Sequence, residues 1–114
     1  MKYLVVVLPQ AHEDVEIIVS WLLQRSPTGA TAWYRRWCAM LNELSRSADR
    51  CVEAPESADH SQQLHQLQFK TRRGHHYRVI FVIQNSKVYV LHVRGSGQDL
   101  LSPDEIRHPD EPLN

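Results

Sequence analysis

The residues of this sequence best suited to chemistry on an anion lie between positions 64 and 94. This segment contains no Asp or Glu, although the whole chain contains 13 acidic residues. Lysine neutralises an anion as a point charge, and arginine can hold a carboxylate or phosphate through two parallel hydrogen bonds. The cationic residues of the segment are Lys70, Arg72, Arg73, Arg78, Lys87 and Arg94. We expect this segment to meet an anionic partner.

The cationic character is local, because the formal net charge of the 114-residue chain is zero at pH 7. Residues 1–63 contain six basic and eight acidic residues, and residues 95–114 contain one basic and five acidic residues. The acidic regions are therefore expected elsewhere on the surface. The length and the 42% hydrophobic content fit one globular domain, which we place at residues 1–106, with a frayed tail at 107–114.

Histidines and cysteines offer other chemistry. His75 and His76 adjoin the turn predicted at Arg73-Gly74, where an imidazole can act as acid or base near neutral pH; exposed turn histidines without a role are the favoured interpretation. A zinc site is not indicated, because the available ligands lack the short paired spacing of zinc modules. These ligands would be Cys38, Cys51, His60 and His65. We expect neither a metal ion nor another cofactor.

The cellular location follows from what the chain lacks. No apolar run reaches the roughly 20 residues of a membrane span, and Tyr3–Leu8 is too short for the core of a signal peptide. We therefore expect a cytoplasmic protein that does not enter membranes. In that reducing compartment Cys38 and Cys51 are expected as free thiols, although a disulfide between them is the alternative.

Apolar periodicity predicts two consecutive helices. Val15, Ile18, Val19 and Leu22 fall on one face of a helix over His12–Arg25. Ser26-Pro27 then supplies an N-cap and a first-turn proline for a second helix. The apolar residues of that helix recur at spacings of three, four and seven: Ala30, Trp33, Trp37, Met40, Leu41, Leu44 and Ala48. Helices joined this tightly form an antiparallel hairpin.

Aromatic residues gather on these helices at Trp21, Trp33, Tyr34 and Trp37. At helical spacing such residues indicate core packing far more often than a platform for stacking nucleic-acid bases. After the second helix the periodicity disappears, and Asp49–Ser61 is predicted to be a surface loop.

Four segments are predicted to be strands. Tyr3–Leu8 is an apolar run expected to be covered on both faces and ended by Pro9. Residues 67–72 alternate between one apolar face, with Leu67, Phe69 and Thr71, and one polar, cationic face, with Gln68, Lys70 and Arg72. Tyr77–Ile83 and Val88–Val93 are almost entirely apolar, as in central strands. A short helix could start at Ser102. The order β-α-α-β-β-β predicts an α+β fold, with a small, mostly antiparallel sheet and a helical hairpin on one face.

An ordered set of short motifs resembles the RelE/ParE superfamily of toxins from toxin–antitoxin modules, which includes plasmid stabilisation proteins. These motifs are Leu8-Pro9-x-Ala11, Ser26-Pro27-x-x-Ala30, Tyr77-Arg78-Val79-Ile80-Phe81 and Val90-Leu91-His92-Val93-Arg94. The resemblance covers about residues 3–106 and implies the RelE/ParE-like fold.

The resemblance also implies activities. RelE-like members are ribosome-dependent endonucleases that cut mRNA by attack of a 2′-hydroxyl on the adjacent phosphate. Fixed guanidinium groups stabilise the negative charge of that transition state without having to titrate. The resemblance makes Arg78, Lys70, Arg72 and Arg94 the candidate catalytic residues. The candidate binding residues are Arg73, His75, His76, His92 and Gln98.

Two positions depart from the family pattern. Gln98 stands where many of the endonucleases have a late catalytic arginine, and Gly95 stands where ParE-like members have a histidine. Because Gln98 supplies no charge, the preferred interpretation is a ParE-like toxin that binds a target such as DNA gyrase. A RelE-like, metal-independent mRNA interferase and an inactive relic of a toxin remain the alternatives.

The implied partners follow from these interpretations. We expect a cognate antitoxin, whose acidic segment meets the cationic sheet, and either gyrase or the ribosome with its mRNA as the target. The protein would be a monomer or part of a heteromeric complex with the antitoxin. The length of the turn at Gln84–Ser86 decides whether Arg78 and Arg94 share one face, which the sequence leaves open.

Overall fold

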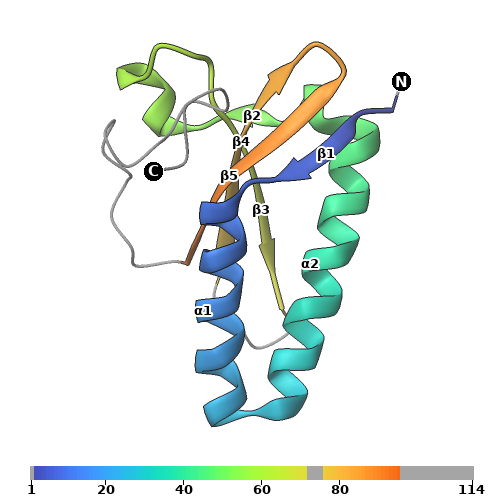
Figure 1. The fold of residues 1–114 in the computed structure, drawn as a ribbon, viewed down its shortest axis with the longest axis vertical. Helices are drawn as coiled ribbons and strands as arrows, with labels where there is room; N and C mark the ends of the chain where they lie inside the picture. The colour runs from blue at the N-terminus through green and yellow to red at the C-terminus, as the bar shows by residue number, and fades with distance from the viewer. Residues whose placement is uncertain (1, 72–75, 96–114) are drawn as a thin grey trace.

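The computed structural model describes residues 2–71 and 76–95, and these form an antiparallel helical hairpin packed on one face of a mixed sheet (Figure 1). This arrangement confirms the predicted α+β class. The elements are β1 (Leu4–Val7), α1 (Pro9–Arg25), α2 (Pro27–Ser47), the 3₁₀ helix η1 (Ala48–Arg50), β2 (Val52–Glu53), the 3₁₀ helix η2 (Pro55–Asp59), β3 (His65–Lys70), β4 (His76–Gln84) and β5 (Lys87–Gly95). The predicted helix start at Ser102 and the tail at 107–114 lie outside the described residues.

The two helices meet at Ser26, as the sequence predicts. The Ser26 N–H donates to the Leu22 carbonyl and so closes α1, while the Ser26 Oγ accepts a 3.0 Å hydrogen bond from the Gly29 N–H at the start of α2. The predicted start of α1 at His12 is wrong, because the helix already begins at Pro9. A proline is favourable there, since the first helical N–H has no partner in any case.

The sheet has five strands in the order β1-β5-β4-β3-β2, with β1 parallel to β5 and every other pair antiparallel. The predicted coverage of β1 on both faces is wrong: β1 lies at the edge, and Leu4 is 61% exposed. The β4–β5 hairpin turns at Asn85-Ser86, where Asn85 has a φ of 58°. Asparagine adopts this left-handed conformation more readily than most residues.

A β-bulge interrupts the pairing of β4 with β5. Phe81 pairs with Val90, but Ile80 pairs with His92, so Leu91 is an extra residue on β5. Side chains alternate between the faces of a strand, and one extra residue reverses that alternation. Beyond the bulge, Arg94 therefore lies directly opposite Arg78.

The helix-facing side of the sheet carries the larger apolar core. Trp33 on α2 stacks on Trp37 with ring centroids 6.0 Å apart, and its ring also contacts Phe69 at 5.6 Å and Tyr77 at 5.5 Å. Phe81 is fully buried in the same cluster. Burial also raises the pKa of Tyr77.

The core interpretation of the aromatic residues is thus confirmed for two of them and wrong for two. Trp33 and Trp37 are 1% and 4% exposed, whereas Trp21 and Tyr34 are 46% and 51% exposed. The reason is their position on the helix surface: Trp21 lies off the stripe of Val15, Ile18 and Leu22 that packs on the sheet.

The other side of the sheet, which we call the open face, carries a smaller apolar cluster. Its buried members are Ala54, Leu64, Ile80, Val82 and Leu91. Residues 51–64, which we call the cover segment, fold onto this face: the Ala54 N–H donates to the Leu64 carbonyl at 2.8 Å. The prediction of an irregular loop at Asp49–Ser61 is wrong in part, since this range contains the end of η1, all of β2 and all of η2.

Within the described residues, no helix is both long enough and apolar enough to cross a membrane.

Candidate anion-binding site

Polar side chains of β3, β4 and β5 gather at one end of the open face. Gln68, Arg78 and Arg94 are direct cross-strand neighbours, and Lys70 pairs with His76 one step further along. Residues directly opposite each other in antiparallel strands point to the same face, with Cβ atoms about 4.5–5.5 Å apart. Lys70, Arg78 and Arg94 thus share one face, and the β-bulge is what brings Arg94 there.

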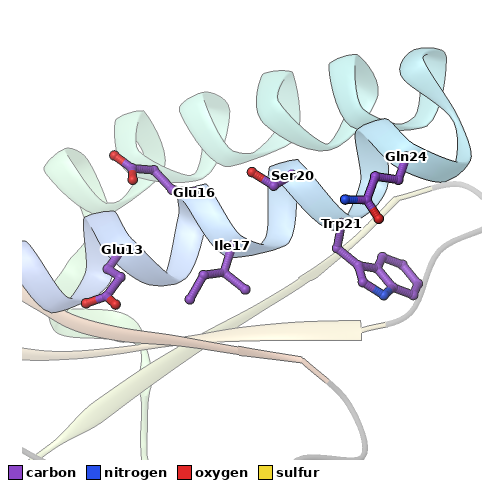
Figure 2. Close-up of a pocket in the computed structure, with 6 residues that line it drawn as sticks. All are labelled: Glu13, Glu16, Ile17, Ser20, Trp21 and Gln24. Atoms are coloured by element: carbon purple, nitrogen blue, oxygen red, sulfur yellow. The ribbon is translucent and has the colours of Figure 1, made fainter.

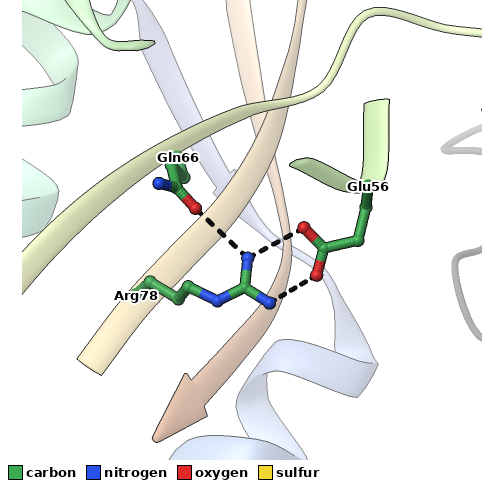
Figure 3. Close-up of polar contacts among 3 residues, drawn as sticks. All are labelled: Glu56, Gln66 and Arg78. Carbon is green, nitrogen blue, oxygen red and sulfur yellow. Dashed lines mark hydrogen bonds and ion pairs between the residues drawn. The ribbon is translucent and has the colours of Figure 1, made fainter. Parts of the chain in front are cut away.

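Arg78 is held by a carboxylate of the cover segment (Figure 3). Its Nη1 donates to Glu56 Oε1 at 2.8 Å and to Gln66 Oε1 at 3.2 Å, and its Nη2 pairs with Glu56 Oε2. The side chain of Arg78 is 15% exposed and that of Glu56 is 1% exposed. The guanidinium of Arg78 therefore forms a bidentate ion pair with Glu56, and Gln66 accepts a further hydrogen bond from it.

Because this ion pair is buried, losing one of its two partners costs more free energy than it would in a pair on the surface. A carboxylate taken out of water loses several kcal/mol of hydration, and only a close counter-ion with good geometry offsets that loss. Removing one partner of such a pair costs about 3–5 kcal/mol, because the other charge is left buried alone. Arg78 and Glu56 therefore depend on each other, and Glu56 neutralises the charge of Arg78.

The remaining described candidates differ in exposure. Lys70 and His76 are exposed at adjacent ends of β3 and β4, and Arg94 is half-buried. His92 is 6% exposed, and its Nδ1 lies 3.1 Å from Asp14 Oδ2 on α1. The same Asp14 oxygen accepts a 2.9 Å hydrogen bond from the Val93 N–H. Asp14 thereby joins α1 to β5, and a binding role for His92 stays a prediction.

Four predicted site residues, Arg72, Arg73, His75 and Gln98, lie outside the described residues, and their roles stay predictions.

Sequence reasoning missed Glu56, Gln66 and Asp14. A signal for Glu56 was present: Arg78 is the lone charge in an apolar strand, and such a charge requires a counter-ion. The preceding segment, read as a loop, offered the acidic residues, but nothing in its pattern selected Glu56.

Metal binding has no support in the part of the chain that the structure describes, which contains no group of three or more His, Cys, Asp or Glu side chains able to hold an ion. Cys38 and Cys51 are free thiols, as predicted. His65 Nδ1 lies 3.4 Å from the Cys51 carbonyl oxygen, and His60 Nδ1 accepts a hydrogen bond from the Gln62 N–H at 3.1 Å.

A separate groove of about 470 Å³ runs along α1 (Figure 2). Its lining residues are Glu13, Glu16, Ile17, Ser20, Trp21 and Gln24. Ile17 and Trp21 project on the side of α1 away from α2, and the Arg25 guanidinium lies 3.8 Å from the centroid of the Trp21 ring. This acidic and apolar lining contrasts with the cationic open face and includes none of the predicted site residues.

Comparisons with known proteins find a match in structure but none in sequence. No protein-family model matches the sequence, and no curated protein matches it. The fold does match a chain of the solved structure named "Chromosomal ParDE TA system from P. aeruginosa", with a TM-score of 0.61. The match covers 82% of this chain and 96% of that chain at 11% sequence identity. A likeness at this identity establishes a shared fold.

Proposed function

The chain has a RelE/ParE-like fold, and from this premise we propose that it is the toxin of a type II toxin–antitoxin module, of the kind called plasmid stabilisation proteins. In this proposal it acts in the ParE-like manner, by binding a cytoplasmic target such as DNA gyrase. The partner that restrains it is a cognate antitoxin. The likeness to the ParDE TA system supports the first part of the proposal, and the state of Arg78 supports the second.

The observation that carries the ParE-like mechanism is the ion pair of Arg78 with Glu56. Phosphoryl chemistry on mRNA needs preorganised cations whose charge is directed at the phosphate oxygens. A guanidinium already matched by a buried carboxylate contributes little field to such a phosphate. Together with Gln98 in place of the late family arginine, this weakens the case for a nuclease and favours action by binding.

The second candidate is a RelE-like, metal-independent mRNA endonuclease that the ribosome completes. One observation favours it: Lys70, Arg78 and Arg94 share the open face, in neighbouring strands. In this mechanism the substrate 2′-hydroxyl attacks the adjacent phosphate and the 5′-oxygen of the next nucleotide leaves. The cations would stabilise the charge that develops on the phosphate, provided that a ligand separates Arg78 from Glu56.

Two assays on the purified protein separate the candidates. We expect inhibition of DNA supercoiling by gyrase and little cleavage of mRNA on translating ribosomes. The loss of one transition-state charge contact lowers a rate by roughly 10²–10³, so slow residual cleavage remains compatible with this expectation. Gln98→Arg serves as a gain-of-charge variant, which does not create cleavage in a protein that acts only by binding.

The opposite result is equally specific. Efficient, codon-phased cleavage by the unmodified protein, abolished by Arg78→Ala, would establish the endonuclease. Cleavage that rises sharply in Gln98→Arg would also place this chain on the RelE-like side, with Arg78 and Lys70 already forming the rest of its site. Absence of both activities in a folded, monodisperse sample would identify an inactive relic.

A further inference from the structure

The contacts of Arg78 have the form of a ligand site. Two guanidinium nitrogens meet the two oxygens of one carboxylate, and Gln66 Oε1 accepts a further hydrogen bond at 3.2 Å (Figure 3). Arginine recognises the carboxylates of bound peptides with this same paired geometry. Here the carboxylate belongs to the chain itself, because Glu56 lies on the cover segment.

Glu56 reaches Arg78 from η2, a short element of the cover segment that lies outside the sheet strands. η2 contains five residues, and it is attached through the β2–β3 pairing and the bond from the Ala54 N–H to the Leu64 carbonyl. Ser57 adds a second attachment, since its Oγ accepts a 2.9 Å hydrogen bond from the Leu64 N–H. These anchors are bonds of the neighbouring residues Ala54, Ser57 and Leu64, so they need not break when the carboxylate of Glu56 leaves Arg78.

We propose that Arg78 and Gln66 form a carboxylate-binding site, that Glu56 is its built-in occupant, and that an acidic segment of a protein partner binds by displacing Glu56. The inference deepens the proposed function, on which it rests for the acidic character of the antitoxin. The exchange is feasible because Arg78 keeps a carboxylate partner throughout, while Glu56, at 1% exposure, regains its hydration in water.

The surroundings of the site favour a peptide over RNA. The occupant carries one negative charge on two oxygens, as an aspartate or glutamate of a partner does. The neighbouring apolar cluster of Ile80, Val82 and Leu64 is buried and supplies no counter-charge for the further phosphates of an RNA backbone. Lys70 is exposed and lies two residues along β3 from Gln68, which pairs with Arg78. It offers a surface contact to a second acidic side chain of the peptide.

The proposal makes Glu56 an internal competitor. When a site is open for only a fraction of the time, its apparent affinity for a ligand falls by that fraction. Removing the competing carboxylate should therefore strengthen the binding of an acidic peptide, and this gain should require Arg78. A role of Glu56 in stability alone predicts no such gain.

The test compares Glu56→Gln with Glu53→Gln by titrating each full-length protein with a hexaglutamate peptide in a calorimeter. Glu53 is the matched control, because it lies on the same cover segment, is exposed, and bonds Ser57 rather than Arg78. Both variants change the net charge equally. We expect about tenfold tighter peptide binding by Glu56→Gln, at most about twofold by Glu53→Gln, and loss of the gain when Arg78→Gln is added.

Equal gains in the two variants would overturn the proposal, because they would reflect net charge alone. An equal or larger gain for a hexauridylate RNA would overturn it in favour of a phosphate site. Should Glu56→Gln fail to fold, the unmodified protein decides: the Arg78 Nε–H signal in a ¹⁵N NMR spectrum must shift as hexaglutamate is added, and a signal that does not move overturns the proposal. Neither gyrase nor ribosomes enter these titrations, so their failure is distinguishable from failure of the proposed function.

Discussion

The two faces of the sheet are stabilised in different ways. On the helix-facing side, Trp33, Trp37, Phe69 and Tyr77 pack together, and their contribution scales with the apolar area removed from water. On the open face, a smaller apolar cluster lies beside one specific ion pair. An apolar core tolerates changes that keep its volume, whereas a buried ion pair tolerates no change that removes one partner alone. We therefore expect the ion pair on the open face to tolerate fewer kinds of substitution than the apolar core on the helix-facing side.

The largest expected effect is on the helix-facing side. Trp33→Ala and Phe81→Ala each remove a side chain at most 1% exposed and leave a cavity, so each should lower the free energy of unfolding by about 3–5 kcal/mol. Trp21→Ala is the control, because Trp21 is 46% exposed, and its effect should stay below about 1 kcal/mol. Chemical denaturation measures all three. A loss in Trp21→Ala as large as in Trp33→Ala would contradict the assignment of the faces.

The second largest effect is expected for the Arg78–Glu56 ion pair on the open face. A double-mutant cycle with Glu56→Gln, Arg78→Gln and the double variant measures its coupling energy. We expect a coupling energy of about 2–3 kcal/mol, because each single change leaves a buried charge or a buried donor unmatched, whereas the double variant leaves neither. The same cycle with Glu53→Gln in place of Glu56→Gln should give a coupling near zero. A coupling near zero for Glu56 as well would mean that the two side chains do not meet in solution.

The smallest effect concerns two thiols and leaves stability unchanged. Burial raises the pKa of Cys51, and the carboxylates of Glu43 and Asp49 raise it further, whereas Cys38 is exposed on α2. Because the thiolate is the reactive form, iodoacetamide should alkylate Cys51 more slowly than Cys38 at pH 8. In denaturant the two rates should converge. Mass spectrometry of timed samples measures both rates, and faster reaction of Cys51 would show that its surroundings open readily.

The difference between the faces also explains how much of the molecule was predictable from the sequence. Helices and strands that bury a regular apolar stripe show a matching periodicity in the sequence. The helical hairpin, the Ser26 cap and the strands around Tyr77–Ile83 and Val88–Val93 were therefore predicted correctly. The boundaries were less accurate, as at Pro9. The two-residue strand β2 is too short to produce a pattern.

The candidate site was predictable only in part. The cationic character of residues 64–94 is visible in composition, but the partner of Arg78 lies 22 positions away in a segment without periodicity. Which acidic residue reaches an arginine depends on the path of the whole cover segment, and short-range patterns do not encode that path. The face of Arg94 depends on the bulge at Leu91, because a single extra residue reverses the alternation of side chains and no motif in the sequence marked it.

The parallel pairing of β1 with β5 has a consequence for how the protein is made. Leu4 pairs with Lys87, so the sheet cannot be completed until nearly all of the described chain has left the ribosome. At roughly 5–20 residues per second, synthesis from Ser47 to Gly95 takes about 2–10 s, and during that time the finished helical hairpin has no sheet to cover its apolar stripe. Slow codons placed between these positions would lengthen the delay. They should increase the aggregated fraction while every contact of the folded protein stays the same.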